Sequence, residues 1–209
     1  PRSVPSWPAL QKFVAERYLT VDVRTLALFR IYFGLVLLVD IVRRIPYVTM
    51  FYSNEGILPN HFALYAPMAE PNVSLLYALS TPAEARFAFG IGALIALAYA
   101  VGFQTRVAQF LGFLFIASLN TRNLFVENGG TVVMAVVAAW ALFFPLGERF
   151  SVDAWMAAKT ASEAGRPAPV FREKFVSLAM LGVTLQVCVI YFLNMVQKFD
   201  VAWTTGEAV

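Results

Sequence analysis

The chain has 209 residues, of which 59% are hydrophobic and only 14% are charged, and its mean hydropathy is +0.67. Soluble domains carry about a quarter charged residues, so this composition excludes an ordinary soluble domain and indicates an integral membrane protein. The net charge is +3, but the basic residues are scattered among loops, which argues against nucleic-acid binding. One cysteine, Cys188, and one histidine, His61, argue against an intrachain disulfide, a haem held by two histidines and a metal site.

Residues 1–24 form the first predicted segment, which precedes any long apolar run. Five apolar residues recur in it at helical spacing opposite a polar face: Trp7, Leu10, Phe13, Val14 and Tyr18. This pattern favours an amphipathic helix at the membrane interface, and a plain surface helix is the alternative.

Residues 25–209 are predicted to form one transmembrane domain. Five apolar segments follow one another at 25–42, 82–103, 106–119, 131–145 and 175–197. The first covers 18 residues, which at about 1.5 Å per residue barely crosses a hydrocarbon core of about 30 Å. The predicted fold is therefore all-α: a polytopic membrane helix bundle of about five transmembrane helices, with the N-terminal interfacial helix in addition.

Two charged residues inside the first span are expected to be structural. Asp40 is followed three and four residues later by Arg43 and Arg44, so its charge is neutralised locally. Arg30 has no acidic residue at these spacings. We expect Arg30 to face the bundle interior and to meet a group from another helix, either as a structural ion pair or as a charge that faces a substrate.

The distribution of basic residues predicts the orientation. Ten of them flank the spans on the side of the N-terminus: Arg2, Lys12, Arg17, Arg24, Arg106, Arg149, Lys159, Arg166, Arg172 and Lys174. Five lie on the other side: Arg43, Arg44, Arg86, Arg122 and Lys198. Positive charge is enriched in cytoplasmic loops, so the N-terminus is expected in the cytoplasm.

The end of the last span carries the candidate functional residues. Asn194 and Lys198 lie four residues apart and share a helix face, and Asp200 follows. Lys198 either extends its ammonium group from the membrane to water or is kept partly dry to act as a base. Desolvation favours the neutral amine, whereas Asp200 favours the ammonium. Arg122, Glu127 and Asn128 are expected on the same membrane side and complete a candidate substrate pocket.

Four motifs, in this order and spacing, resemble the HTTM domain, the membrane domain of vitamin K-dependent γ-carboxylases and their bacterial relatives. They are Leu28-Phe29-Arg30-Ile31, Tyr52…Glu55-Gly56-Ile57-Leu58-Pro59, Phe150-Ser151-Val152-Asp153 and Tyr191-Phe192…Lys198-Phe199-Asp200…Trp203…Gly206. The resemblance covers nearly all of the chain from Val21 onward. It implies a protein of the bacterial cytoplasmic membrane.

The resemblance also implies a reaction. A lysine at the position of Lys198 is taken in animal carboxylases as the base that deprotonates vitamin K hydroquinone. Oxygen then converts the hydroquinone into a stronger base, which removes a γ-proton from a substrate glutamate before carbon dioxide adds. The expected cofactor is thus a reduced quinone.

Two other functions stay open beside this carbon–carbon lyase chemistry. The family's histidine in the stretch resembling residues 127–130 has no counterpart, because His61 is the only histidine. The chain is alternatively a non-catalytic subunit of a larger membrane complex, or a factor for maturation or export of a secreted peptide. Besides the lipid bilayer, the expected partners are accordingly other membrane subunits or a secreted peptide. A reading frame that continues past Val209 into a soluble domain favours the carboxylase.

Overall fold

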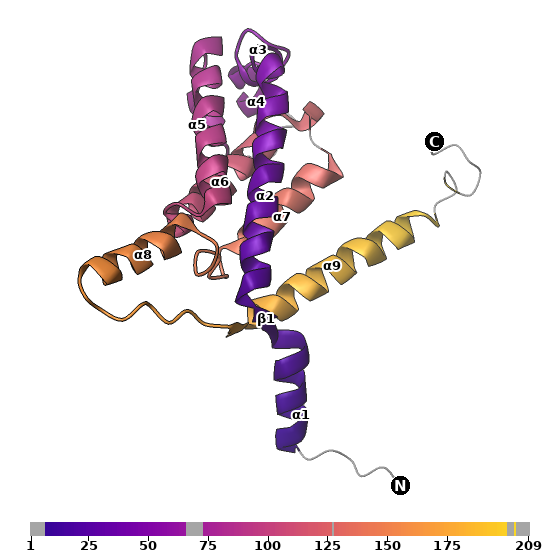
Figure 1. The fold of residues 1–209 in the computed structure, drawn as a ribbon. Coiled ribbons are helices and arrows are strands. Elements are labelled where there is room, and N and C mark those ends of the chain that lie inside the picture. The colour runs from indigo at the N-terminus through magenta and orange to yellow at the C-terminus, as the bar shows by residue number, and fades with distance from the viewer. Residues whose placement is uncertain (1–6, 66–72, 127, 200–202, 204–209) are drawn as a thin grey trace. The chain divides into compact units, whose positions relative to one another are not determined.

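The computed structural model describes residues 7–65, 73–126, 128–199 and 203 (Figure 1). Helices make up most of these residues, and the only strands among them are two of three residues each. The chain divides into two compact units. The larger unit is Asp22–Glu173, and the smaller one combines Pro1–Val21 with Lys174–Val209.

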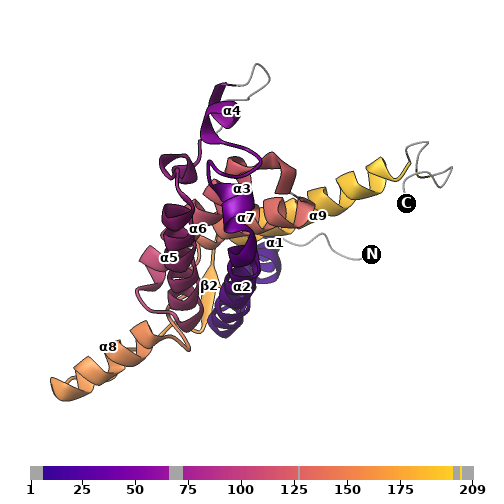
Figure 2. The same ribbon diagram turned by 90° about the horizontal axis from the view of Figure 1, so that it is seen from above.

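The larger unit is built on four helices that run up, down, up and down. They are α2 (Val23–Arg44), α5 (Pro82–Val101), α6 (Thr105–Arg122) and α7 (Gly129–Ala141). Helix α2 packs on α5, α5 on α6, and α6 on α7 (Figures 1 and 2). This arrangement follows from the short connections between α5, α6 and α7, which force neighbours to be antiparallel.

Shorter elements cover the two ends of this unit. Between α2 and α5 lie the 3₁₀ turn η2 (Ile45–Tyr47), α3 (Val48–Tyr52), α4 (Asn60–Tyr65) and the 3₁₀ turn η3 (Leu75–Ala78). The 3₁₀ turn η4 (Leu124–Val126) joins α6 to α7, and α8 (Val152–Glu163) follows α7.

Local sequence explains where the long helices begin and end. The side chain of Thr81 accepts a hydrogen bond from the backbone N–H of Glu84, and the side chain of Glu84 accepts one from the backbone N–H of Thr81. Helix α5 therefore starts with a complete capping box. Asn128 caps α7 in the same way, through the backbone N–H groups of Gly130 and Thr131. Gly102 ends α5 with a φ of 73°, the left-handed conformation that glycine adopts without strain.

Small residues allow the helices of the larger unit to approach closely. A Cβ atom built on Gly34 in α2 would lie 2.7 Å from the Cα atom of Ala100 in α5. A Cβ atom on Gly92 in α5 would lie 2.4 Å from the ring of Phe115 in α6. Apolar lipid gives helices no hydrophobic reason to associate, so this close contact between backbones is a main source of their attraction.

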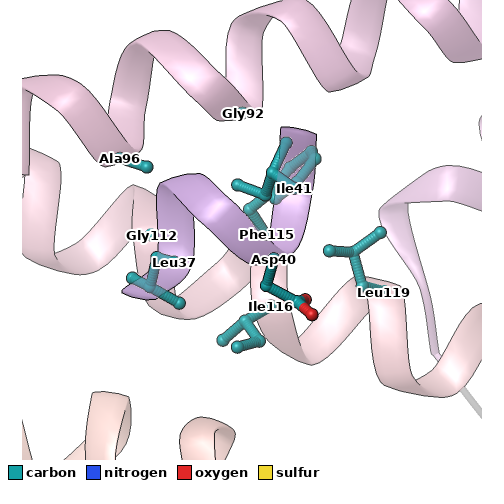
Figure 3. A pocket seen from close by; sticks show the side chains of 9 residues that line it. All are labelled: Leu37, Asp40, Ile41, Gly92, Ala96, Gly112, Phe115, Ile116 and Leu119. Atoms are coloured by element: carbon teal, nitrogen blue, oxygen red, sulfur yellow. The ribbon is translucent and has the colours of Figure 1, made fainter. Parts of the chain in front are cut away.

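The contact between α2, α5 and α6 is nearly filled. The cavity that remains there measures about 10 Å³, roughly the space of a single water molecule (Figure 3). Its walls are Leu37, Asp40, Ile41, Gly92, Ala96, Gly112, Phe115, Ile116 and Leu119. This interior therefore holds the helices together and leaves no room for a substrate.

The smaller unit joins both ends of the chain. Helix α1 (Trp7–Val14) continues into the π turn η1 (Ala15–Leu19), and β1 (Thr20–Asp22) pairs with β2 (Lys174–Val176). Helix α9 (Leu178–Gln197) begins at the N-cap Ser177 and packs its first part on η1. The large apolar side chains of Trp7, Phe13 and Tyr18 are exposed, as an interfacial helix requires.

Three helical segments in the described residues are long and apolar enough to cross a membrane: Val23–Tyr52, Pro82–Val101 and Leu178–Gln197. The other two predicted spans correspond to α6 and α7. Helix α7 has 13 residues, so it covers only about 20 Å of a hydrocarbon core of about 30 Å. The predicted span extends to Pro145, but the α-helix ends at Ala141, and the N–H groups of residues 142–144 bind carbonyls only three residues back. The protein is thus an all-α membrane protein, and a five-span count remains a prediction.

The two glycine environments in α2 and α5 give a first testable prediction. We expect Gly34→Ala to lower the free energy of unfolding by about 1–3 kcal/mol, because the new methyl group meets backbone atoms of α5 that cannot move aside. Gly90→Ala is the matched control, since no atom lies within 4 Å of its added Cβ. The measurement is the thermal midpoint of both variants in detergent. Equal midpoints for the two variants would contradict the close approach of α2 and α5.

Candidate functional site

Arg30 lies fully buried in α2, and its hydrogen bonds to the described residues all go to backbone carbonyl oxygens. Its Nε donates to Ala100 at 3.3 Å, Nη1 donates to Leu146 at 2.9 Å and to Arg149 at 3.2 Å, and Nη2 donates to Phe150 at 2.6 Å. A guanidinium group fits this task because it presents five donors in a planar fork. The charge therefore faces protein, and its partners are carbonyl dipoles instead of a carboxylate.

The Arg30 contacts join three parts of the larger unit at the N-terminal end of α2. Ala100 supplies one of the carbonyls that the last turn of α5 cannot use within the helix. The other three carbonyls belong to the turn after α7. Gly102 lies against the guanidinium group, and a Cβ atom there would be 2.6 Å from Nη1 of Arg30. The site at this end is thus a structural junction whose donors are used by the protein itself.

Two polar residues that the sequence analysis assigned no role complete this junction. The Asp153 carboxylate accepts hydrogen bonds from the backbone N–H groups of Gln104 at 2.8 Å and Thr105 at 2.7 Å, so it caps α6 from another helix. Gln109 donates from α6 to the carbonyl of Ala141 in α7 at 2.6 Å. Serine at position 151, the N-cap of α8, was the available sequence signal for the turn that carries Asp153.

A second polar cluster lies at the opposite end of α2. The Asp40 carboxylate pairs with Arg43 at 3.0 Å and with Arg44 at 2.9 Å. Arg44 also donates to the hydroxyl of Tyr52 at 2.7 Å. Arg44 and Asp40 are buried, whereas Arg43 is largely exposed. The carboxylate is therefore held between two guanidinium groups and is not free to act as a base.

Arg122, at the end of α6, is fully buried near this cluster. Its Nη1 donates to the carbonyl of Leu58 at 3.0 Å, and its guanidinium carbon lies 5.5 Å from the centre of the Tyr77 ring. Its Nε and Nη2 have no hydrogen-bond partner in the part of the chain that the structure describes. Arg122 links the connection after α3 to α6 by this hydrogen bond, so the contacts that the structure shows for it are structural.

Between α2 and α7 the larger unit has an open groove of about 550 Å³, which we call the α2/α7 groove. Its wall on α2 consists of Tyr32, Leu35, Val36, Val39, Asp40 and Arg43, and its wall at α7 consists of Asn128, Gly130, Thr131 and Met134. A further hollow of about 420 Å³ shares Arg43 and Asn128 with the groove and adds Arg44, Tyr47 and Val126. Asn128 thus caps α7 and also lines the groove.

Lys198 ends α9 in the smaller unit. Its backbone N–H donates to the carbonyl of Met195, the next N–H, that of Phe199, donates to the carbonyl of Val196, and Nζ of Lys198 lies 5.9 Å from the centre of the Trp203 ring. Asn194 donates to the carbonyl of Ile190 within the same helix at 2.9 Å. Asn194 and Lys198 thus share one helix end, while Arg122 and Asn128 belong to the larger unit.

The remaining predicted pocket residues, Glu127 and Asp200, lie outside the described residues. Of the predicted site residues that are described, Lys198 forms no ion pair with a described residue, whereas Asp40 is paired with two arginines. The described residues contain no group of three His, Cys, Asp or Glu side chains that could hold a metal ion.

Substitution of Arg30 tests the junction. We expect Arg30→Leu to cost roughly 1–3 kcal/mol for each carbonyl left without a donor, and Arg30→Lys to be destabilising as well because one ammonium group cannot reach all four oxygens. Arg24→Leu, at the exposed start of the same helix, is the matched control. The thermal midpoint in detergent is the measurement. A midpoint for Arg30→Leu equal to that of the control would show that the four contacts do not hold the fold.

Comparison with known proteins identifies the family. The HTTM domain family matches residues 18–209, which is almost the whole chain. No curated protein and no solved structure matches it. The matched region includes every motif on which the resemblance was based. The chain therefore belongs to the HTTM domain family.

Proposed function

We propose that this membrane protein performs quinone-dependent chemistry of the γ-carboxylase type, with Lys198 as the base. The observation that carries the proposal is the position of Lys198 at the end of a 20-residue apolar helix, next to an aromatic ring. A lysine at this place meets both water and a ligand dissolved in the membrane. Within the described residues, no carboxylate forms an ion pair with Lys198.

Three aromatic side chains within seven residues of Lys198 along the chain suit a flat apolar ring. Tyr191, Phe199 and Trp203 are 74%, 74% and 49% exposed, so their faces are available for stacking. A reduced quinone supplies an ionisable hydroxyl group when it is bound. The aromatic side chains would hold and orient the ring, and Nζ of Lys198 would accept the hydroxyl proton. The ammonium group so formed is stabilised by the face of Trp203.

The second candidate is a non-catalytic role in a membrane assembly, including one that matures or exports a secreted peptide. It is favoured by α9, in which no described residue is buried. Gln186 lies near the middle of this helix, and its amide has no hydrogen-bond partner among the described residues. A polar amide at this depth is stabilised by a partner on another helix.

Two substitutions at Lys198 separate these functions. If Lys198 is the base, Lys198→Arg and Lys198→Ala should both abolish turnover, because arginine keeps its proton. A general base contributes at least about 100-fold to the rate, so the turnover of each variant should fall by more than that factor. Turnover is measured in membranes as oxygen-dependent consumption of vitamin K hydroquinone together with incorporation of labelled carbon dioxide.

The readout of folding is the thermal midpoint of each purified variant, with Lys174→Arg as a matched exchange at an exposed lysine of the same unit. Full turnover in Lys198→Arg would remove the catalytic proposal. The accessory role is supported instead if wild-type membranes show no turnover and if Lys198→Ala, but not Lys198→Arg, fails to assemble with other subunits.

We also infer five spans with the N-terminus in the cytoplasm of a bacterial cell, on the basis of the unequal distribution of basic residues. Single cysteines at Ser162 and Glu55, both exposed, test this in a Cys188→Ala background. A membrane-impermeant maleimide should label Glu55→Cys in intact spheroplasts and Ser162→Cys only after lysis. Labelling of both positions before lysis would contradict the five-span topology.

A further inference from the structure

The α2/α7 groove has a shape and a depth that match one leaflet of a bilayer. Arg43 lies at the end of the α2 span and Tyr32 lies 11 residues before it. This separation corresponds to about 16 Å along the helix, and half of a hydrocarbon core is about 15 Å. With Arg43 at the membrane surface, the groove would reach about the middle of the bilayer.

The part of the groove farthest from Arg43 is apolar and exposed. Tyr32 and Val39 are 71% and 64% exposed, and Leu35 and Met134 line the same part. The groove exists because α7 packs on α6 while α2 packs on α5. An extended hydrocarbon chain fills such a space, whereas an additional transmembrane helix requires contact over the whole thickness of the membrane.

The shallow end of the groove is cationic. Arg43 uses one Nη2 contact for Asp40, and its Nε and Nη1 have no partner among the described residues. Asp40 is also paired with Arg44, so these three side chains together carry one positive charge. The amide of Asn128 and the hydroxyl of Tyr47 add neutral donors beside Arg43. Donors of this kind bind the oxygens of a phosphate group.

We propose that the α2/α7 groove binds one anionic phospholipid of the bilayer, with its phosphate at Arg43 and an acyl chain along Tyr32, Val39 and Met134. This binding does not depend on Lys198 or on the proposed reaction. The groove is poorly suited to the reaction itself, since Asp40, the only acidic residue among its described lining residues, is held by two arginines.

The first test is a lipid titration of the detergent-purified full chain, followed by native mass spectrometry. Phosphatidylglycerol should bind at one site, and phosphatidylcholine should bind more weakly. Arg43→Gln should reduce affinity for phosphatidylglycerol about fivefold, the effect of one basic residue near an anionic headgroup. Equal binding of the two lipids by the wild type would overturn the proposal.

Two further variants locate the site. Arg24→Gln makes the same change at the exposed opposite end of α2 and should leave affinity unchanged. Val39→Trp should block the acyl chain and weaken binding while Arg43 is intact. The proposal is overturned if Arg24→Gln weakens binding as much as Arg43→Gln does, or if Val39→Trp has no effect in a chain with a wild-type thermal midpoint.

A phosphatidylglycerol with a diazirine in its acyl chain gives an independent readout in membranes. After photolysis, labelled peptides should come from the groove faces of α2 and α7, around Val39 and Met134. Labelling spread evenly over exposed helices, including α9, would mean ordinary contact with bulk lipid and would overturn the proposal. A crosslink between a photoreactive residue at Val39 and α9 or a second protein would show another occupant and would overturn it as well.

Discussion

The guanidinium group of Arg30 organises the larger unit because four backbone carbonyls converge on it. Burial of a charge in a membrane protein is unfavourable unless the protein replaces the lost hydration. Here the replacement comes from Ala100 at the end of α5 and from Leu146, Arg149 and Phe150 in the turn after α7. The same carbonyls would otherwise lack donors in an environment without water. The guanidinium donors and the carbonyl acceptors thus complete each other's hydrogen bonding. For this reason α2, α5 and the turn after α7 must meet at this point.

The buried charges at the two ends of α2 are compensated in different ways. At the N-terminal end, Arg30 donates to four backbone carbonyls, and the nearby Asp153 carboxylate accepts from the first N–H groups of α6. At the C-terminal end, Asp40 compensates Arg43 and Arg44, and Tyr52 adds a hydroxyl group. The exposed member, Arg43, is the one that retains unused donors. Within this cluster, the unused donors of Arg43 are therefore the groups that a ligand can reach.

The residue proposed to accept a proton, in contrast, belongs to the smaller unit. Lys198 ends a helix whose described residues are all accessible, and Trp203 lies within cation–π distance of its ammonium group. The face of Trp203 would stabilise the ammonium group that forms when the proposed base accepts a proton. Membership in the HTTM domain family is the reason to consider this lysine as a functional residue. The local geometry describes how a flat ring would approach it.

The sequence by itself determined the class of protein and the features that depend on neighbours along the chain. Hydropathy predicted a membrane protein, and the α5 capping box and the ion pairs of Asp40 depend on residues at most four positions apart. The partners of Arg30 were decided only by tertiary structure, because they are backbone carbonyls up to 120 positions away and every residue carries such a carbonyl. The same reason applies to the carbonyl of Leu58, which lies 64 positions before Arg122 and accepts from its guanidinium group. The sequence shows which side chains carry hydrogen-bond donors, whereas the carbonyls that accept from them are known only once the helices have packed.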